Sequence, residues 1–529
     1  MKKTLPIVSL IFLLLCSCNN SPSSKIHTIS TEIQTANGPI LGSLNKDQRV
    51  LSFKGIPYAS APIGNLRWRP PVAVESWTEL KDCREFKASP IQAKPSPFYM
   101  WSSEFLIPEK PISEDGLYLN IWAPKKYSSQ GNAVMVYIHG GGFASGSGSV
   151  PIYDGEAMAK KGIVFVSINY RLGLFGFLAH PELSQESITK TSGNYGLLDQ
   201  ISALQWIQNN ISFFGGNPSN VTIAGQSAGA ASVAFLMASP LAKGLFHKAI
   251  AQSGAGILPR NPNSPGLGLQ DLKTAEATGI ALSEKLGLSI EEMRKIPANQ
   301  LFSQVNFRGH PILDGHVIPD EISSIYTNAQ QAHIPLITGW NEDDGIVMGG
   351  FQSAADFTKN IAQQWGSSSK QLLKFYPASD QNTAEKSQGY LQRDLVFGAQ
   401  NYTMANLISK QGLDVFVYRF KRDLPDGNQP DFGAFHTGEV PYAYNNLHTV
   451  DRPFETEDFN LADIMSSYWV NFAKNSNPNS EELPNWNPYT AASKNIMIFD
   501  KEQKQSSLVD AETLDFLVET LLLSKNVVQ

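Results

Sequence analysis

Short apolar runs recur along the chain, and polar or glycine-containing segments separate them. Several runs are rich in β-branched or aromatic residues and have the length of single strands. They are residues 134–138, 163–168, 221–224, 335–338 and 415–420. Because these runs are almost continuously apolar, they predict central strands that are buried on both faces of a sheet.

Between these runs the apolar spacing changes to that of a helix. Leu198, Ile201 and Leu204 recur every three residues, and Asp199 stands near the start, where a negative charge suits the helix dipole. Strands that alternate with helices predict a largely parallel sheet, and such sheets bind ligands beyond the carboxyl ends of their strands. We therefore expect the chemistry of this protein in the turns that follow the strands.

The first such turn carries a serine between two glycines. Residues 225–229 read Gly-Gln-Ser-Ala-Gly, directly after the strand 221–224 and before a run of small residues that suits a helix. A turn this tight leaves no space for side chains at the glycine positions and holds the serine in a strained conformation with its hydroxyl exposed. The pattern alone also occurs in ordinary glycine turns. With a strand before it and a helix after it, it predicts that Ser227 is a nucleophile.

A second turn, residues 139–142, consists of one histidine and three glycines and follows the strand 134–138. Glycines let backbone N–H groups approach a ligand, because no Cβ atom stands in the way. When a serine attacks an ester carbonyl, negative charge develops on the oxygen, and fixed N–H donors stabilise it. We assign these donors to Gly141, Gly142 and Ala228. Without Ser227, a flexible glycine loop with a structural His139 would be the better interpretation.

A nucleophilic serine needs a histidine base that a carboxylate orients. In the α/β-hydrolase fold, which these two motifs indicate, the chain order is serine, acid, histidine. That order leaves five candidate bases: His310, His316, His333, His436 and His448. His436 lies in a glycine-bounded loop after the strand 415–420 and is favoured, with His448 as its nearest rival.

The candidate acids are Glu342, Asp343 and Asp344, which follow the strand that ends near Thr338. From the pattern alone any of the three could serve. Three consecutive acids are also typical of a solvated turn, so the pattern leaves the acid open.

Further segments make the chain resemble the type-B carboxylesterase family, which also contains the cholinesterases, over nearly its whole length. These segments are residues 53–59, 66–71, 113–122, 193–200 and 214–218. The resemblance implies an α/β-hydrolase fold in which helices flank a mostly parallel central sheet and further helices form cap insertions. It also implies one catalytic domain over residues 29–529 and hydrolysis of carboxylic esters through an acyl-enzyme, without a cofactor.

The same resemblance selects among the open candidates. Residues 339–345 match a family block that places the acid directly before its last glycine, which is Asp344 here. Aspartate replaces the usual glutamate and is one methylene shorter, so the turn must approach the histidine more closely. Residues 433–439 match the family's histidine block and select His436 over His448.

Two departures from the family pattern change what we expect. The family commonly bridges one loop with a disulfide, but Pro90 and Gly116 stand at the two positions, so we expect a more mobile loop. The residue before the nucleophile is usually glutamate and is Gln226 here. The loss of that negative charge favours neutral esters over cationic choline esters.

Composition excludes some classes of function. The net charge is −6, and no lysine or arginine cluster suits a phosphate backbone, so we expect no nucleic-acid partner. The cysteines and histidines show no zinc-type spacing, so no metal is expected.

The N-terminus has the pattern of an export signal. Lys2 and Lys3 precede an apolar run that is too short for a permanent membrane span. Cys18 follows a leucine at the third position before it and a serine directly before it, which resembles a bacterial lipobox. We expect a signal peptide over residues 1–17, a lipid on Cys18 and a polar tether over residues 18–28. The protein would then be anchored to a membrane, on the periplasmic side or at the cell surface; a plain secretory peptide is the alternative.

Two questions remain open from the sequence. Some relatives of this family keep the fold and lose the serine, so a non-catalytic binding or adhesion module is the alternative function, and amide or thioester hydrolysis is a third. The acyl and alcohol groups of the substrate are also open, because the pocket would be built from insertions over residues 256–310 and 349–400 that carry no motif. Cys83 is expected to be a buried packing residue.

Overall fold

The computed structural model describes residues 25–259, 269–345, 350–425 and 432–523. The predicted signal peptide, Cys18 and most of the predicted tether lie outside the described residues. The last three residues of that tether form strand β1 (Ile26–Thr28), which pairs antiparallel with β10 (Lys126–Ser128). The folded unit therefore includes residues 26–28.

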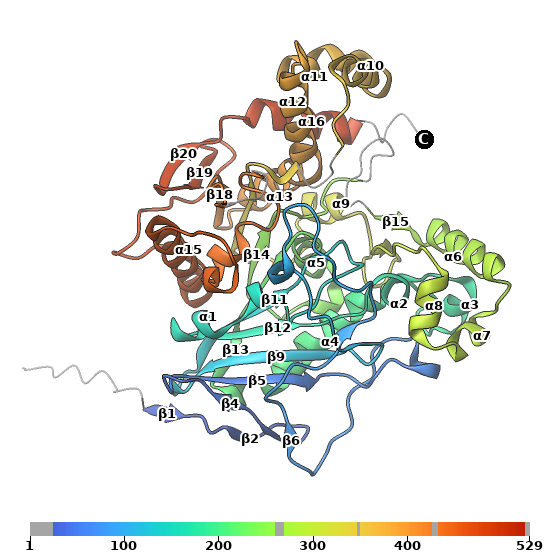
Figure 1. The fold of residues 1–529 in the computed structure, drawn as a ribbon, viewed down its shortest axis with the longest axis vertical. Coiled ribbons are helices and arrows are strands. Elements are labelled where there is room, and N and C mark those ends of the chain that lie inside the picture. Colours follow the sequence, from blue (N-terminus) through green and yellow to red (C-terminus); the bar gives the residue numbers. More distant parts are fainter. Residues whose placement is uncertain (1–24, 260–268, 346–349, 426–431, 524–529) are drawn as a thin grey trace, which may run out of the picture.

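One mixed sheet runs through the molecule, with the strand order β20-β19-β18-β17-β14-β13-β11-β12-β9-β5-β4 (Figure 1). The strands are β4 (Ser43–Leu44), β5 (Val50–Pro57), β9 (Tyr118–Pro124), β11 (Asn132–Ile138), β12 (Val164–Ile168), β13 (Gly216–Gln226), β14 (Lys248–Gln252), β17 (Leu336–Asn341), β18 (Val415–Phe420), β19 (Asn495–Phe499) and β20 (Lys504–Ser507). Every pairing from β12 across to β19 is parallel, and antiparallel strands complete both edges. All the predicted strands lie in this parallel section, so they are confirmed.

Strand β11 shows why the apolar runs are uninterrupted. Val134, Val136 and Ile138 pack into one hydrophobic core, while Met135 and Tyr137 point to the opposite face and pack into the other. All five side chains are fully buried. A strand covered on both faces needs apolar residues at every position, and the alternating pattern of a half-exposed strand is absent from this one.

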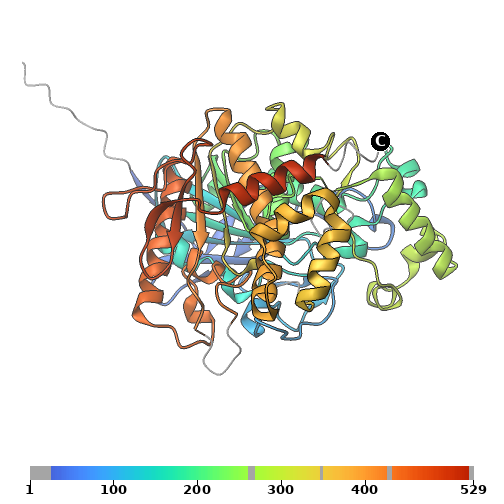
Figure 2. The same ribbon diagram turned by 90° about the horizontal axis from the view of Figure 1, so that it is seen from above.

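Helices cover both faces of the sheet (Figures 1 and 2). One core contains side chains of α4 (Tyr195–Asn210), α5 (Ala228–Ala238), α13 (Ala399–Lys410) and α16 (Ala511–Leu523); the other contains side chains of α1 (Glu156–Lys160), α14 (Val440–Ala443) and α15 (Thr456–Asn475). This arrangement confirms the predicted fold class.

Helix α4 confirms the predicted helix around Leu198, but the role of Asp199 is different from the one expected. Its carboxylate accepts two hydrogen bonds from the guanidinium of Arg171, both at 2.7 Å, and both side chains are buried. Asp199 is therefore half of a buried ion pair rather than a solvated charge at the helix start.

Further helices and short strands lie in the segments between the main strands. The helices are α2 (Gly173–Phe177), α3 (Pro181–Glu186), α6 (Leu272–Leu286), α7 (Ile290–Lys295), α8 (Ala298–Gln304), α9 (Ile322–Thr327), α10 (Ala354–Trp365), α11 (Ser369–Phe375) and α12 (Gln381–Arg393). The short strands are β2 (Glu32–Gln34), β3 (Pro39–Leu41), β6 (Lys81–Asp82), β7 (Ser89–Pro90), β8 (Ile112–Ser113), β15 (Gln270–Asp271) and β16 (Ile312–Leu313). Helices α6 to α8 lie on one flank of the molecule, and α10 to α12 lie beyond the sheet near α16 (Figure 1). These two groups supply the helical insertions that the sequence predicted.

The loop that was expected to lack a disulfide is held at its ends by other contacts. Strand β7 pairs with β8, and a Cβ atom built on Gly116 would lie 3.0 Å from the Cα of Pro90. Gln92 exchanges two hydrogen bonds with the backbone of Gly146, each of 2.8 Å. The two bridge positions thus remain neighbours, while the greater mobility of the loop stays a prediction.

Cys83 is buried and unpaired, as the sequence led us to expect. Burial raises the pKa of its thiol to about 11, which keeps the sulfur protonated and unreactive at neutral pH. In the part of the chain that the structure describes, no helix combines the length and the apolar character needed to cross a bilayer.

Candidate active site

Ser227 lies in the turn between β13 and α5, at the carboxyl end of a central strand. Its φ is 58° and its ψ is −121°, a strained backbone conformation for a residue with a side chain. A Cβ atom on Gly225 would overlap the backbone of Gly229, and one on Gly229 would overlap the carbonyl oxygen of Ile138. The turn therefore has the geometry that the glycine–serine–glycine pattern predicted.

The backbone of Ser227 is held from the next strand of the sheet. Its amide donates to the carbonyl oxygen of Gln252 at 2.9 Å, and Gln252 is the last residue of β14. Gly254 packs behind the serine, since a Cβ atom there would lie 2.6 Å from the carbonyl oxygen of Ser227. These contacts fix the strained conformation from the side opposite the helix.

The predicted oxyanion donors lie beside the serine. Gly141 and Gly142 have φ angles of 102° and 62°, in the left-handed region that glycine tolerates. A Cβ atom on the adjacent Gly140 would lie 3.0 Å from the Cβ of Ser227, so this loop touches the serine. Within the described chain, the amides of Gly141, Gly142 and Ala228 donate no hydrogen bond to another residue. They are therefore available to an oxygen atom of a ligand.

The structure brings His436 and Asp344 together. The Nδ1 atom of His436 lies 2.8 Å from Oδ1 of Asp344, and both side chains are buried. Asp344 follows β17 and His436 follows β18, which are neighbours in the sheet, so both reach the same edge. The other carboxylate oxygen of Asp344 accepts the amide of Asn341 at 2.7 Å. With its Nδ1–H directed at the carboxylate, the imidazole presents the lone pair of Nε2.

The Nε2 atom faces the residue that precedes the serine. The side-chain amide nitrogen of Gln226 lies 3.2 Å from it, within hydrogen-bonding distance. Among the described contacts, no hydrogen bond joins the hydroxyl of Ser227 to the ring of His436. Hydrogen bonds between a nucleophile and its base are often long until substrate binds, so this geometry does not remove His436 as a candidate base.

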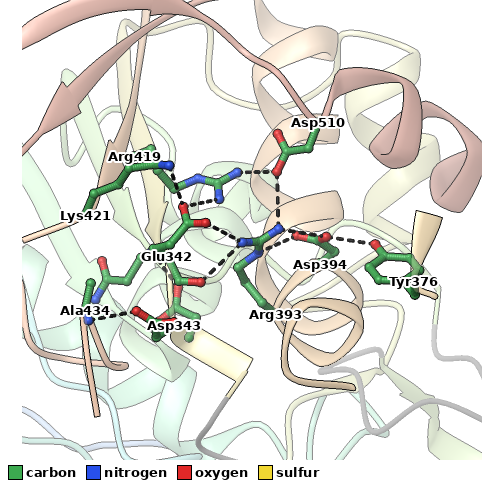
Figure 3. A network of polar contacts seen from close by, with 11 residues as sticks. Glu342, Asp343, Tyr376, Arg393, Asp394, Arg419, Lys421, Ala434 and Asp510 are labelled. Carbon is green, nitrogen blue, oxygen red and sulfur yellow. Dashed lines mark hydrogen bonds and ion pairs between the residues drawn. The ribbon is translucent and has the colours of Figure 1, made fainter. Parts of the chain in front are cut away.

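The other two acids of the turn have different partners. Glu342 binds Arg393, Arg419 and Lys421, and Asp343 accepts the amide of Ala434 at 2.9 Å (Figure 3). Burial raises the pKa of Asp343 to about 6. The interpretation of the three acids as a solvated turn is wrong, because Asp344 is fully buried and Glu342 is held by three cations.

The remaining candidate histidines lie elsewhere. His310, His333 and His448 are exposed, and His316 lines a surface cavity of about 580 Å³ together with Asp314. His448 lines a different surface cavity, of about 530 Å³, with Asp154 and Lys160. The described structure therefore pairs His436 alone, of these five, with Asp344.

Two further side chains next to the candidate base were missed by the sequence reasoning. Glu439 is fully buried and accepts hydrogen bonds from Asn341 at 2.7 Å and from Gln252 at 3.2 Å. Burial, and then the negative charge of Asp344, raise the pKa of Glu439 to about 7. Phe397 stacks on the ring of His436 with 4.4 Å between ring centroids. Glu439 closes the histidine block and so carried a signal; Phe397 carried none.

Side chains suited to a metal are not clustered here. In the described ranges, no group of three or more histidine, cysteine, aspartate or glutamate side chains is placed to hold a metal ion.

Comparisons with known proteins agree with this geometry. A family model described as "Carboxylesterase family" matches residues 29–517. The chain is 34% identical over 465 residues to fumonisin B1 esterase of Sphingopyxis macrogoltabida, covering 83% of this chain and 81% of the relative. It is 34% identical over 488 residues to para-nitrobenzyl esterase of Bacillus subtilis, covering 89% and 95%. It is 30% identical over 528 residues to liver carboxylesterase 1 of Oryctolagus cuniculus, covering 91% and 92%.

Proposed function

Because the chain belongs to the carboxylesterase family and is a carboxylic ester hydrolase, we propose that it cleaves its substrates with Ser227, His436 and Asp344 through an acyl-enzyme. The observation that carries the proposal is the buried 2.8 Å contact between His436 and Asp344, next to the strained turn of Ser227. A base oriented by a carboxylate is what a serine needs to become nucleophilic at neutral pH.

In the first half of the cycle, the hydroxyl oxygen of Ser227 bonds to the ester carbonyl carbon while its proton moves to Nε2 of His436. The carbonyl oxygen takes up the negative charge and accepts hydrogen bonds from the amides of Gly141, Gly142 and Ala228. His436 then returns its proton to the alcohol oxygen as the bond to the acyl carbon breaks. In the second half, water takes the place of the serine hydroxyl and releases the acid.

Gln226 has a part in this cycle, because its amide occupies the hydrogen-bonding position on Nε2 of His436. For proton transfer, that amide must give up Nε2 to the hydroxyl of Ser227. The two residues are adjacent in the chain, so a rotation of the glutamine side chain is sufficient.

We propose neutral, small-molecule esters as the substrates. Gln226 is uncharged at the position where the family resemblance leads us to expect a glutamate. The raised pKa of Glu439 further reduces negative charge behind the base near neutral pH. Both features remove the charges that would attract a cationic alcohol group. Turnover of matched neutral and choline esters of the same acid compares the two classes, and a preference for the choline ester would contradict this assignment.

The test of the nucleophile is Ser227→Ala. We expect it to lower kcat for p-nitrophenyl acetate by about 10⁴-fold or more and to abolish labelling by a fluorophosphonate probe. Ser232→Ala is the matched control, since Ser232 lies in the same helix with its hydroxyl bonded to Gln200 at 3.0 Å. The control should label and turn over like the wild type. Hydrolysis retained by Ser227→Ala would contradict the proposal, and a purely binding module would neither hydrolyse nor label.

We also propose that the protein is an exported lipoprotein, with a signal peptide over residues 1–17 and an anchor on Cys18. The lipobox-like sequence before Cys18 supports this proposal. Cys18→Ser should move the enzyme from the membrane fraction to the soluble fraction and stop incorporation of an alkyne-labelled fatty acid. A wild-type chain that is exported without that label would favour the plain secretory peptide.

A further inference from the structure

One continuous helical segment, residues 393–401, contacts the supports of all three catalytic candidates. It consists of the last residue of α12, the π-helix η8 (Asp394–Gly398) and the first residues of α13. A π-turn is rare within a helix and is frequent at functional sites, because it shifts the direction of the side chains that follow it. What this segment touches indicates its role.

Phe397 of this segment contacts the candidate base. Its ring stacks on the ring of His436, with 4.4 Å between centroids and 24° between planes. Both residues are buried. The imidazole is thus held on one edge by Asp344, at Nε2 by Gln226 and on one face by Phe397. Of these contacts, the stack with Phe397 is the one that restricts the tilt of the ring.

Arg393 of the same segment contacts the turn of the candidate acid. Its guanidinium donates to the backbone carbonyl of Glu342 at 3.3 Å and to the carboxylate of Glu342 at 3.1 Å, two residues before Asp344 (Figure 3). The same guanidinium binds Asp394 and Asp510. Asp394 is the first residue of the π-helix, so Arg393 joins the acid turn to the element that carries Phe397.

Asn401 of this segment contacts the support of the serine. Its side-chain oxygen accepts the amide of Gly254 at 2.9 Å, and its side-chain nitrogen donates to Thr338 at 2.7 Å and to the carbonyl oxygen of Ala251 at 3.2 Å. Gly254 is the residue that packs behind the carbonyl of Ser227. The polar side chain of Asn401 is fully buried, and these bonds use it entirely to hold neighbouring segments.

We propose that residues 393–401 position the catalytic residues, and that Phe397 is the positioning residue for His436. This inference rests on the proposed function. When the aromatic face is removed, the imidazole gains freedom to tilt, and Nε2 spends less time aligned with the serine hydroxyl and with the departing alcohol. Fewer aligned conformers mean a lower kcat without a change in substrate binding.

The choice of alcohol distinguishes this role from a general loosening of the fold. p-Nitrophenolate leaves readily without a proton, whereas benzyl alcohol must receive one from His436 as its bond breaks. The two esters share the acyl group and have alcohols of similar size. A misaligned imidazole therefore slows benzyl acetate more than p-nitrophenyl acetate, and a loosened fold slows both alike.

The variants are Phe397→Leu, Phe397→Tyr and the control Phe357→Leu, which changes a buried phenylalanine of α10. We expect Phe397→Leu to lower kcat about tenfold for benzyl acetate and about threefold for p-nitrophenyl acetate, with KM within about twofold of the wild type, a partial loss of general acid–base catalysis. Phe397→Tyr keeps the aromatic face and should restore both rates to within about threefold, and Phe357→Leu should leave the ratio of the two rates unchanged. If Phe397→Leu does not melt cooperatively, Phe397→Met takes its place with the same expectations.

Several outcomes would overturn the inference. They are equal losses for the two esters, a rise in KM with unchanged kcat, a failure of Phe397→Tyr to restore the rates, or the same change of ratio in Phe357→Leu. Failure of the proposed function is visible separately, because the wild-type enzyme would then neither hydrolyse these esters nor take the fluorophosphonate label at Ser227.

Discussion

The hydrogen bond between His436 and Asp344 is sheltered from water, since 5% of the histidine and none of the aspartate is exposed to solvent. A charge-assisted hydrogen bond is stronger in such a low-dielectric environment than at the surface. The bond therefore orients the imidazole strictly, and its loss should be felt in the rate of turnover.

Asp344→Asn tests this relationship. The amide keeps the size of the carboxylate but cannot stabilise an imidazolium and favours the wrong tautomer of His436. We expect kcat for p-nitrophenyl acetate to fall by about 10⁴-fold. Asp343→Asn is the control, because Asp343 holds the amide of Ala434 instead of the histidine, and it should cost less than about tenfold. Equal losses in the two variants would mean that Asp344 is not the acid.

The oxyanion donors can be tested with a pair of glycine variants. A Cβ atom on Gly141 would overlap the backbone of Ser145, whereas one on Gly142 would meet nothing within 4 Å. Gly141→Ala must therefore displace its own amide, and we expect kcat to fall about 10²-fold with little change in KM. Gly142→Ala carries only the strain of its positive φ, about 1 kcal/mol, and should cost less than about tenfold. A larger loss in Gly142→Ala than in Gly141→Ala would contradict the arrangement of this loop.

Glu439 should make stability depend on pH. Its pKa is raised from 4.5 to about 7 in the folded chain, so the folded state binds this proton more tightly than the unfolded chain does. The resulting stabilisation is complete below pH 4.5 and is lost as pH rises through about 7, a difference of about 3 kcal/mol in the free energy of unfolding.

Glu439→Gln removes this titration. Calorimetric melting temperatures measured at pH 4.5 and pH 8 should therefore differ less in the variant than in the wild type. The exposed Glu481 provides the control, and Glu481→Gln should melt with the pH dependence of the wild type. A variant Glu439→Gln with unchanged pH dependence would show that another group is responsible.

The neighbouring positions Pro90 and Gly116 offer a site for an engineered disulfide. A Cβ atom on Gly116 would lie 3.0 Å from the Cα of Pro90, which is compatible with the short separations that a disulfide requires. Closing the loop between the two positions should stabilise the fold by about 3 kcal/mol. We expect Pro90→Cys combined with Gly116→Cys to raise the melting temperature in the oxidised form, and a reductant to abolish the rise. The single variant Pro90→Cys should show no response to reductant.

Much of the fold and of the site was predictable because it depends on local sequence. The buried strands follow from uninterrupted apolar runs, and the turn of Ser227 follows from two glycines that no other residue can replace. His436 and Asp344 could be narrowed to short segments by chain order. The choice among neighbouring acids came from a family resemblance, since no local rule distinguishes Asp343 from Asp344.

The rest depends on which segments meet in three dimensions. Nothing near Asp199 indicates that Arg171 will neutralise it, and the helix pattern instead pointed to a solvated charge. The stack of Phe397 on His436 and the contacts of Arg393 with the acid turn join residues that are distant in the chain. A buried phenylalanine or arginine looks the same in sequence whether it faces a catalytic ring or an ordinary core.

The oxyanion loop, Ser227, Asp344 and His436 follow strands β11, β13, β17 and β18, which stand close together in the sheet with only β14 among them. Each long insertion therefore leaves and re-enters the sheet at fixed points. Insertions of different length or composition can be exchanged between relatives while the spacing of the reacting groups stays constant. Diversity of substrates within one family then requires no reinvention of the bond-breaking step, and grafting an insertion from a relative is a direct route to a new ester preference.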